Sequence, residues 1–141
     1  MENILHPLLR LISALATLIF LAAVAHAHYE HDARTMLCAG MDQEVWLETS
    51  RTRADCISAT HAIEVDWSPH WAEGIGQSLH YADITGLRPG LILVCKDGAA
   101  VCQRHFYNAE QTIRNWQMPI TIWFCVFGDV LETCERSEPQ I

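Results

Sequence analysis

The residues best suited to chemistry in this chain are acidic side chains on two short neighbouring segments. Asp55 lies in the first segment, and Glu64 and Asp66 lie in the second. Both segments have the composition of short β-strands, and neighbouring strands lie about 4.8 Å apart. Carboxylates that face the same side of such a pair can share a divalent metal ion, and a metal held in this way can act on a phosphodiester. Glu64 and Asp66 are two residues apart, so they are expected on the same face of their strand.

The segment after Asp66 is predicted to be a helix that adds polar groups beside the carboxylates. Ser68-Pro69 is typical of a helix start, with Ser68 as the N-cap, and Gly86 is typical of a helix end. A glycine in mid-helix costs up to about 1 kcal/mol relative to alanine, so Gly74 is expected to have a reason such as a close approach of backbone. The polar residues recur at helical spacing and form one stripe: His70, Gly74, Gln77 and Tyr81.

The succession of Asp55, Glu64-x-Asp66 and Gln77-x-x-x-Tyr81 resembles the PD-(D/E)XK nuclease superfamily, in its RecB-like and Holliday-resolvase-like branch. The resemblance implies a restriction-endonuclease-like core and Mg²⁺- or Mn²⁺-dependent cleavage of nucleic acid. It implies that Asp55 and Glu64 hold the metal and that Gln77 and Tyr81 line the site.

Two further roles follow from the same resemblance. The family often takes one metal ligand from the first helix, where Glu30 is the best match and His31 the next. The family's usual lysine is replaced by Asp66, whose negative charge cannot stabilise the charge that develops on phosphorus. Asp66 is therefore expected to act as a base or as a further metal ligand, and His70 is the nearest cationic side chain in the sequence.

The N-terminal region predicts export. Residues 8–24 are nearly all apolar, and Ala25-His26-Ala27 follows with the small-x-small pattern of a cleavage site. We expect residues 1–27 to be a signal peptide and residues 28–141 to be one domain in the periplasm or outside the cell. The alternative is an uncleaved membrane anchor, because the apolar run approaches the roughly 17 residues that span a bilayer.

The cysteines support the same compartment. All six lie after the predicted signal peptide, and an even number in an exported chain favours disulfides. A zinc site is the competing interpretation, but the chain has no Cys-x-x-Cys pair. Six cysteines allow 15 pairings, and the sequence alone does not choose among them. Proximity in the sequence favours Cys95 with Cys102 and Cys125 with Cys134, which would leave Cys38 with Cys56.

The charge argues against tight binding of nucleic acid. The formal net charge is −8, and Lys96 is the one lysine in the chain. Proteins that bind a duplex neutralise its phosphates with lysine and arginine, so nucleic acid is expected to bind weakly unless metal ions supply positive charge. A catalytically inactive binding or interaction module with a protein partner is therefore the alternative to a nuclease.

The pattern of apolar residues predicts an α/β (α+β) domain with a mixed sheet and helices on both faces. Three short strands with tight turns indicate an antiparallel meander, and helices then alternate with buried strands. The resulting order is α-β-β-β-α-β-α-β. The expected helices are 28–39, 68–85 and 103–116, and the expected strands are 44–49, 52–58, 61–67, 91–94 and 120–127.

Overall fold

The computed structural model describes residues 2–139, apart from the side chains of residues 2–9, 23–28 and 30. The chain separates into two compact units, Met1–Asp32 and Ala33–Ile141. The first unit consists of helix α1, which spans Glu2–Leu37 and ends in the second unit. Within the described part of the chain, no helix has the length and apolar character needed to cross a membrane. The predicted cleavage site at 25–27 lies among the residues whose side chains are not described, so the signal peptide stays a prediction.

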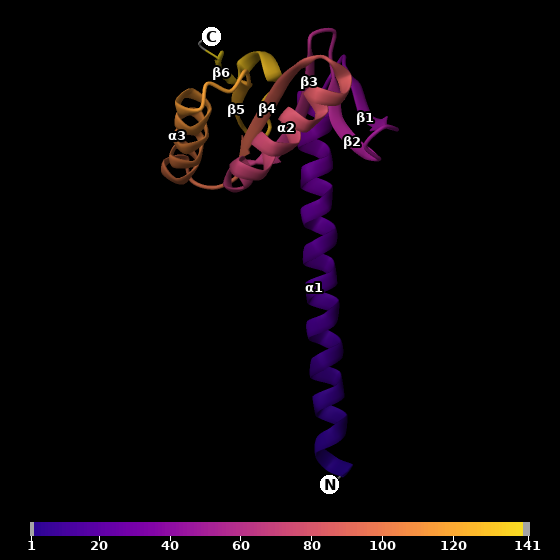
Figure 1. Ribbon diagram of the computed structural model, residues 1–141. Helices are drawn as coiled ribbons and strands as arrows, with labels where there is room; N and C mark the ends of the chain where they lie inside the picture. Colours follow the sequence, from indigo (N-terminus) through magenta and orange to yellow (C-terminus); the bar gives the residue numbers. More distant parts are fainter. Residues whose placement is uncertain (1, 140–141) are drawn as a thin grey trace. The chain divides into compact units, whose positions relative to one another are not determined.

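The second unit is built on a mixed sheet of six strands in the spatial order β1-β2-β3-β4-β5-β6 (Figure 1). The first three strands form an antiparallel meander, β3, β4 and β5 are parallel, and β6 is antiparallel to β5. The predicted α/β class and mixed sheet are confirmed. The strands are β1 Asp42–Leu47, β2 Thr52–Ile57, β3 His61–Trp67, β4 Arg88–Cys95, β5 Thr121–Val126 and β6 Glu135–Ser137.

Two crossover helices connect the parallel strands and cover one face of the sheet (Figure 1). Helix α2, Trp71–Thr85, joins β3 to β4, and helix α3, Ala99–Asn115, joins β4 to β5. Their apolar side chains pack on the residues of β4 and β5 that face them. Both helices lie on the same face because right-handed crossovers that advance in one direction through a sheet all fall on one side.

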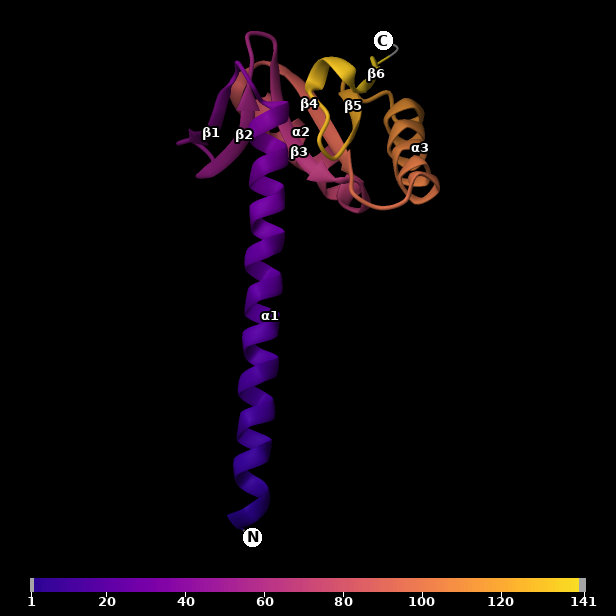
Figure 2. The ribbon, with the colours of Figure 1, turned by 180° about the vertical axis from the view of Figure 1, so that it is seen from behind.

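The other face of the sheet is covered by the last turn of α1 and by the C-terminal segment (Figure 2). Ala33 and Leu37 are buried there against Ile63 and Val65 of β3. The short helical turn η2, Leu131–Thr133, contributes Leu131 to the same cluster. Helical residues therefore lie on both faces of the sheet, as the sequence predicts.

Three disulfides join the cysteines in the pairs expected from the sequence. The Cα–Cα distances are 5.8 Å for Cys38–Cys56, 5.6 Å for Cys95–Cys102 and 4.7 Å for Cys125–Cys134. All three distances lie within the range that a disulfide spans. This arrangement fits an oxidising compartment, because disulfides do not persist in a reducing cytoplasm.

The region before α2 differs from the prediction. Ser68 does not cap the α-helix, because Ser68–His70 forms a 3₁₀ turn and α2 begins at Trp71. The Ser68 hydroxyl is fully buried and contacts His105 Nδ1 at 3.1 Å. This contact also gives His105 a partner that the sequence did not indicate.

Removing disulfides one at a time should destabilise the domain in the order of the loops that they close. The chain-entropy model gives about 3 kcal/mol for the loop of Cys38–Cys56 and about 2 kcal/mol for the shorter loop of Cys95–Cys102. We expect paired Cys→Ala variants, followed by urea denaturation at neutral pH, to show this order. Equal losses, or a reactive thiol in the denatured oxidised wild type, would contradict the prediction.

Candidate functional site

The candidate site lies where strands β2 and β3 separate. The ladder between them pairs Cys56 with Ile63 and Ile57 with Ala62. In contrast, β1 and β2 pair from one end to the other except at Glu44 and Asp55. The backbone ladder stops at the pair Cys56–Ile63. Beyond it on β3, the Val65 N–H donates at 3.0 Å to the side-chain atom Asp55 Oδ2 in place of a backbone carbonyl of β2. This fork opens a place for polar side chains between two strands of the sheet.

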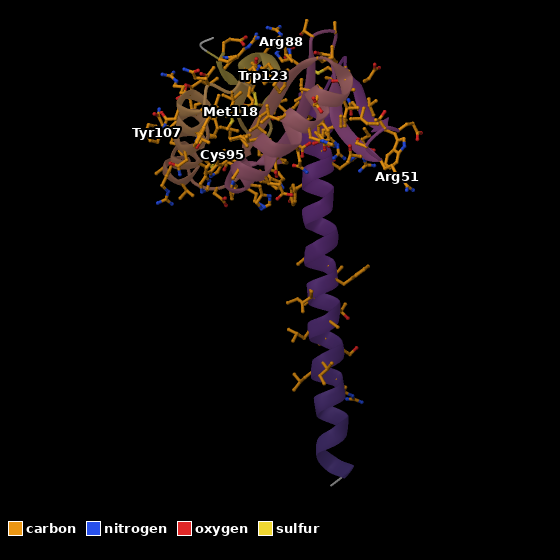
Figure 3. The ribbon with its side chains drawn as sticks, in the orientation of Figure 1. Arg51, Arg88, Cys95, Tyr107, Met118 and Trp123 are labelled. Carbon is orange, nitrogen blue, oxygen red and sulfur yellow. A yellow bond between two sulfur atoms is a disulfide. The ribbon has the colours of Figure 1, made fainter. Side chains whose placement is uncertain are left out.

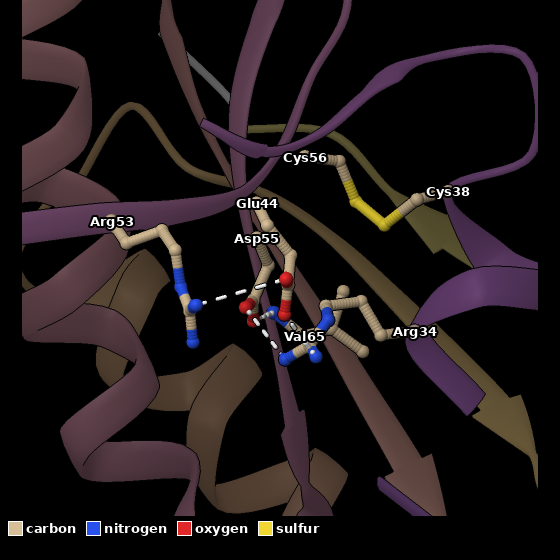
Figure 4. Close-up of polar contacts among 7 residues, drawn as sticks. All are labelled: Arg34, Cys38, Glu44, Arg53, Asp55, Cys56 and Val65. Atoms are coloured by element: carbon tan, nitrogen blue, oxygen red, sulfur yellow. Dashed lines mark hydrogen bonds and ion pairs between the residues drawn. A yellow bond between two sulfur atoms is a disulfide. The ribbon is translucent and has the colours of Figure 1, made fainter. Parts of the chain in front are cut away.

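Arg34, near the end of α1, holds the other oxygen of Asp55 (Figure 4). Arg34 Nη1 lies 3.2 Å from Asp55 Oδ1, and Nη2 lies 2.5 Å from Glu44 Oε1 on β1. Arg53 Nη1 lies 3.7 Å from the second oxygen of Glu44. The side chains of Arg34 and Asp55 are each 13% exposed, so the pair is screened from water much more than a surface ion pair.

The backbone of β1 is distorted where it approaches this arginine. Glu44 has a φ of +50°, which a residue with a side chain adopts at a cost of about 1–2 kcal/mol. Its neighbours Gln43 and Val45 pair normally with Cys56 and Ala54, so the distortion is confined to Glu44. In this distorted conformation the Glu44 carboxylate contacts Arg34.

Glu64 is the most deeply buried carboxyl of the site. It lies on β3 with 7% exposure, and its Oε2 atom has no hydrogen-bond partner. The pKa of Glu64 is raised to about 9 mainly by two causes, of which burial is the larger and the negative charges of Asp55 and Asp66 are the second. Glu64 is therefore protonated at neutral pH, and its hydrogen bond with Asp55 favours that form.

Asp66 is the third carboxyl residue of the site and lies on β3, two residues after Glu64. Its Oδ1 atom lies 3.1 Å from His70 Nδ1 and also accepts from the backbone N–H of Trp67 at 2.7 Å. Burial raises the pKa of Asp66, while these two contacts lower it. The expected proximity of His70 is confirmed, and Arg34 is a second basic residue beside the carboxyls, because it contacts Asp55.

Helix α2 packs its glycine and polar residues onto this part of the sheet. A Cβ atom at Gly74 would lie 2.6 Å from Leu91 Cδ1 and 3.7 Å from Asp66 Cβ, so the close approach at Gly74 is made by side chains of the sheet and not, as expected, by backbone. Gln77 Oε1 is buried without a hydrogen-bond partner. The Tyr81 ring is buried, and its hydroxyl hydrogen-bonds the Glu64 carboxyl, which together with burial raises the pKa of Tyr81.

The structure thus brings together most of the residues that the sequence singled out. Asp55, Glu64, Asp66 and Tyr81 influence one another's charge, and Gln77 lies on the same helix face as Tyr81. The side chain of Glu30 lies outside the described residues. Sequence reasoning missed Arg34, although a signal existed: Arg34 precedes Cys38 by one helical turn, and Asp55 precedes Cys56 by one residue.

The donor atoms of the site suit a hard divalent cation. Mg²⁺ and Mn²⁺ prefer carboxylate and amide oxygens, and Glu64 Oε2 and Gln77 Oε1 are buried acceptors without a partner. Among the described residues, no three His, Cys, Asp or Glu side chains are already arranged around a common ion position. In the arrangement described, Arg34 and the Val65 N–H hold both oxygens of Asp55.

A separate cavity of about 220 Å³ lies beside α3, β5 and β6. Isoleucines form its apolar wall, and Glu110, Arg114 and Glu138 are among its polar residues. None of the predicted site residues lines this cavity.

Comparisons of the chain with protein-family models, with curated proteins and with solved structures found no match.

Glu64 should make the domain less stable as the pH rises from about 5 to 9. The folded protein keeps the Glu64 proton up to a pKa of about 9, whereas the unfolded chain loses it near the ordinary value of 4.5. The folded state binds more protons in this interval, so the free energy of unfolding should fall by up to about 1.4 kcal/mol per pH unit. Urea denaturation of the wild type and Glu64→Gln at several pH values measures the difference, because the variant lacks this slope.

Comparison with the variant is needed because His61 acts in the opposite direction. Burial lowers the pKa of His61, so its contribution to stability is lost as the pH falls below about 6.5. His61 is unchanged in Glu64→Gln, so its effect cancels in the difference. Parallel stability curves for the two proteins between pH 5 and 9 would show that Glu64 is not protonated at neutral pH.

Proposed function

We propose that this domain is an exported, divalent-metal-dependent phosphodiester hydrolase of the PD-(D/E)XK type. The observation that carries the proposal is the meeting of Asp55 and Glu64 at the fork of β2 and β3, with Asp66 two residues further along β3. Tyr81 from α2 completes the group, as the resemblance to this superfamily requires. The antiparallel meander that leads through α2 into a parallel strand is consistent with a restriction-endonuclease-like core.

Each residue has a role that follows from its contacts. Asp55, Glu64 and Asp66 would hold Mg²⁺ or Mn²⁺. The family resemblance alone adds Glu30 as a further candidate, because its side chain lies outside the described residues. When bound, the ion would polarise the phosphoryl oxygen and lower the pKa of a water molecule. Tyr81 supports the ionised form of Glu64 through its hydroxyl. Asp66 is oriented by His70 and the Trp67 N–H, which leaves it placed to accept a proton near the fork.

A specific observation favours the alternative, an inactive nuclease-fold domain that binds a protein partner. Both oxygens of Asp55 have protein partners and Glu64 is protonated, so the cluster is largely satisfied without a metal. Several aromatic side chains are also exposed, and Tyr107 points away from the body of the domain (Figure 3). Exposed aromatic residues are enriched where proteins bind one another.

The compartment forms part of the proposal. Three disulfides support export, and residues 1–27 would act as the signal peptide, with a membrane anchor as the alternative. We expect the mature protein to begin at His28. Sequencing the N-terminus of the extracytoplasmic fraction checks this, and an intact Met1 in the membrane fraction would support the anchor.

Divalent metal should raise the melting temperature of the oxidised domain in a concentration-dependent way. An ion that binds the folded state stabilises it by mass action and relieves the repulsion among the carboxyls. Glu64→Gln should abolish this shift and any cleavage of plasmid DNA or of RNA. The matched control is Glu132→Gln, because Glu132 is exposed and lies on η2, away from the fork.

Two outcomes separate the two functions. Metal binding with cleavage that depends on Glu64 supports the hydrolase. An unmoved melting temperature in millimolar Mg²⁺ and Mn²⁺, with the nucleic acids uncut, would reject the hydrolase and favour the interaction module.

A further inference from the structure

The disulfide Cys38–Cys56 lies beside the ion pair Arg34–Asp55 (Figure 4). Arg34 and Cys38 are four residues apart, and the Cys38 N–H donates to the Arg34 carbonyl at 2.9 Å, so they lie on one side of the last turn of α1. Cys56 follows Asp55 directly on β2. One covalent bond and one ion pair therefore join the same helical turn to the same short stretch of strand.

The ion pair is more sensitive than the apolar contacts to the position of the last turn of α1 relative to β2. Ala33 and Leu37 also hold the turn of α1 against the sheet, but apolar packing tolerates small shifts. The guanidinium group must reach Asp55 with one nitrogen and Glu44 with another, and such fork-like contacts are lost when the backbones move. The disulfide fixes the distance that these contacts need.

Loss of the arginine contact would leave the acidic residues poorly compensated. Glu44 and Asp55 face the same guanidinium from adjacent strands, and Glu64 is close enough to Asp55 for its pKa to respond to it. Arg53 also contacts Glu44, with 3.7 Å between Arg53 Nη1 and Glu44 Oε2. Without Arg34, the negative charges at the fork would repel one another at half-buried positions.

We propose that the disulfide Cys38–Cys56 and the ion pair Arg34–Asp55 are energetically coupled, so that oxidation of the two cysteines favours this arrangement of the carboxyl site. Arg34 is then a positioning residue, which orients the Asp55 carboxyl group. The consequence for metal binding rests on the proposed function, but the coupling between the two contacts does not. Formation of the disulfide after export would then favour assembly of the site.

Reduction of the Cys38–Cys56 disulfide in the test proceeds by thiol–disulfide exchange with glutathione. Cys38 and Cys56 are fully buried, so exchange requires local opening of the end of α1. In the opened state one glutathione thiolate attacks a sulfur of Cys38–Cys56 and forms a mixed disulfide, and a second glutathione resolves it. Cys38 and Cys56 are left as two thiols, and two glutathione molecules become one glutathione disulfide. Oxidation by glutathione disulfide is the reverse of these steps.

Thermodynamic linkage gives a direct test, because two coupled contacts must stabilise each other equally. The oxidised wild type and Arg34→Gln are equilibrated in glutathione buffers of increasing reducing strength, and alkylation followed by mass spectrometry measures each disulfide. In Arg34→Gln, Cys38–Cys56 should become reduced at a reducing strength about fivefold lower, a coupling at the low end of the usual range. Cys95–Cys102 and Cys125–Cys134 should keep their wild-type midpoints.

The controls separate a specific coupling from a general loss of stability. Arg104→Gln changes an exposed arginine on α3 and should move none of the three midpoints. Arg34→Lys keeps the charge but loses the fork, so it should shift the Cys38–Cys56 midpoint in the same direction by less. It also provides the measurement if Arg34→Gln fails to fold.

Asp55→Asn completes the cycle. If the ion pair carries the coupling, the double variant with Arg34→Gln and Asp55→Asn should shift the midpoint for reduction of Cys38–Cys56 no further than either single variant does. An unchanged midpoint, or equal shifts of all three disulfides, would overturn the proposal. Metal titration of the wild type is a separate measurement. If it shows no metal binding, the proposed function fails, but the measured coupling between the disulfide and the ion pair still stands.

Discussion

The burial of several carboxyl groups at the fork of β2 and β3 is the constraint on which the rest of the site depends. A carboxylate removed from water is strongly destabilised unless it is paired, hydrogen-bonded or protonated. The three carboxyls of the fork meet this constraint in different ways: Asp55 pairs with Arg34, Glu64 keeps its proton, and Asp66 accepts from His70 and a backbone N–H. The end of α1, the distortion of β1 and the glycine of α2 all serve this arrangement.

The sheet could be predicted from the sequence where local pattern and burial agree. Strand β3 has the predicted bounds, 61–67, because its apolar residues are flanked by clear turn and helix signals. Strand β6 was missed because its three residues, Glu135–Ser137, are polar and form a strand only by pairing with β5. The Ser-Pro signal misplaced the start of α2, since the Ser68 hydroxyl contacts His105 from a distant helix. Such long-range contacts leave no trace in local spacing.

The same distinction explains what could be predicted of the site. Asp55, Glu64 and Asp66 lie on neighbouring strands, so strand geometry alone indicates that they meet. Arg34 comes from a helix that contacts the sheet through tertiary packing, and nothing in its own neighbourhood marks it. The pairing of Cys38 with Cys56 was the one long-range constraint in the sequence that could have located it. Disulfides predicted from spacing can therefore also locate the side chains beside them.

The state of Glu64 connects the two functions considered for this domain. A metal ion that uses Glu64 must first displace its proton, and at pH 7 a pKa of about 9 makes this roughly a hundredfold penalty in affinity. The penalty falls as the pH rises, and it is offset where the ion replaces the repulsion among three carboxyls with attraction. If the proposed metal binding holds, the fork would be a proton-bound, arginine-paired structural element at low metal concentration, and the same side chains would act as ligands at sufficient concentration. Metal supply and pH, rather than a change of fold, would then decide between the two states.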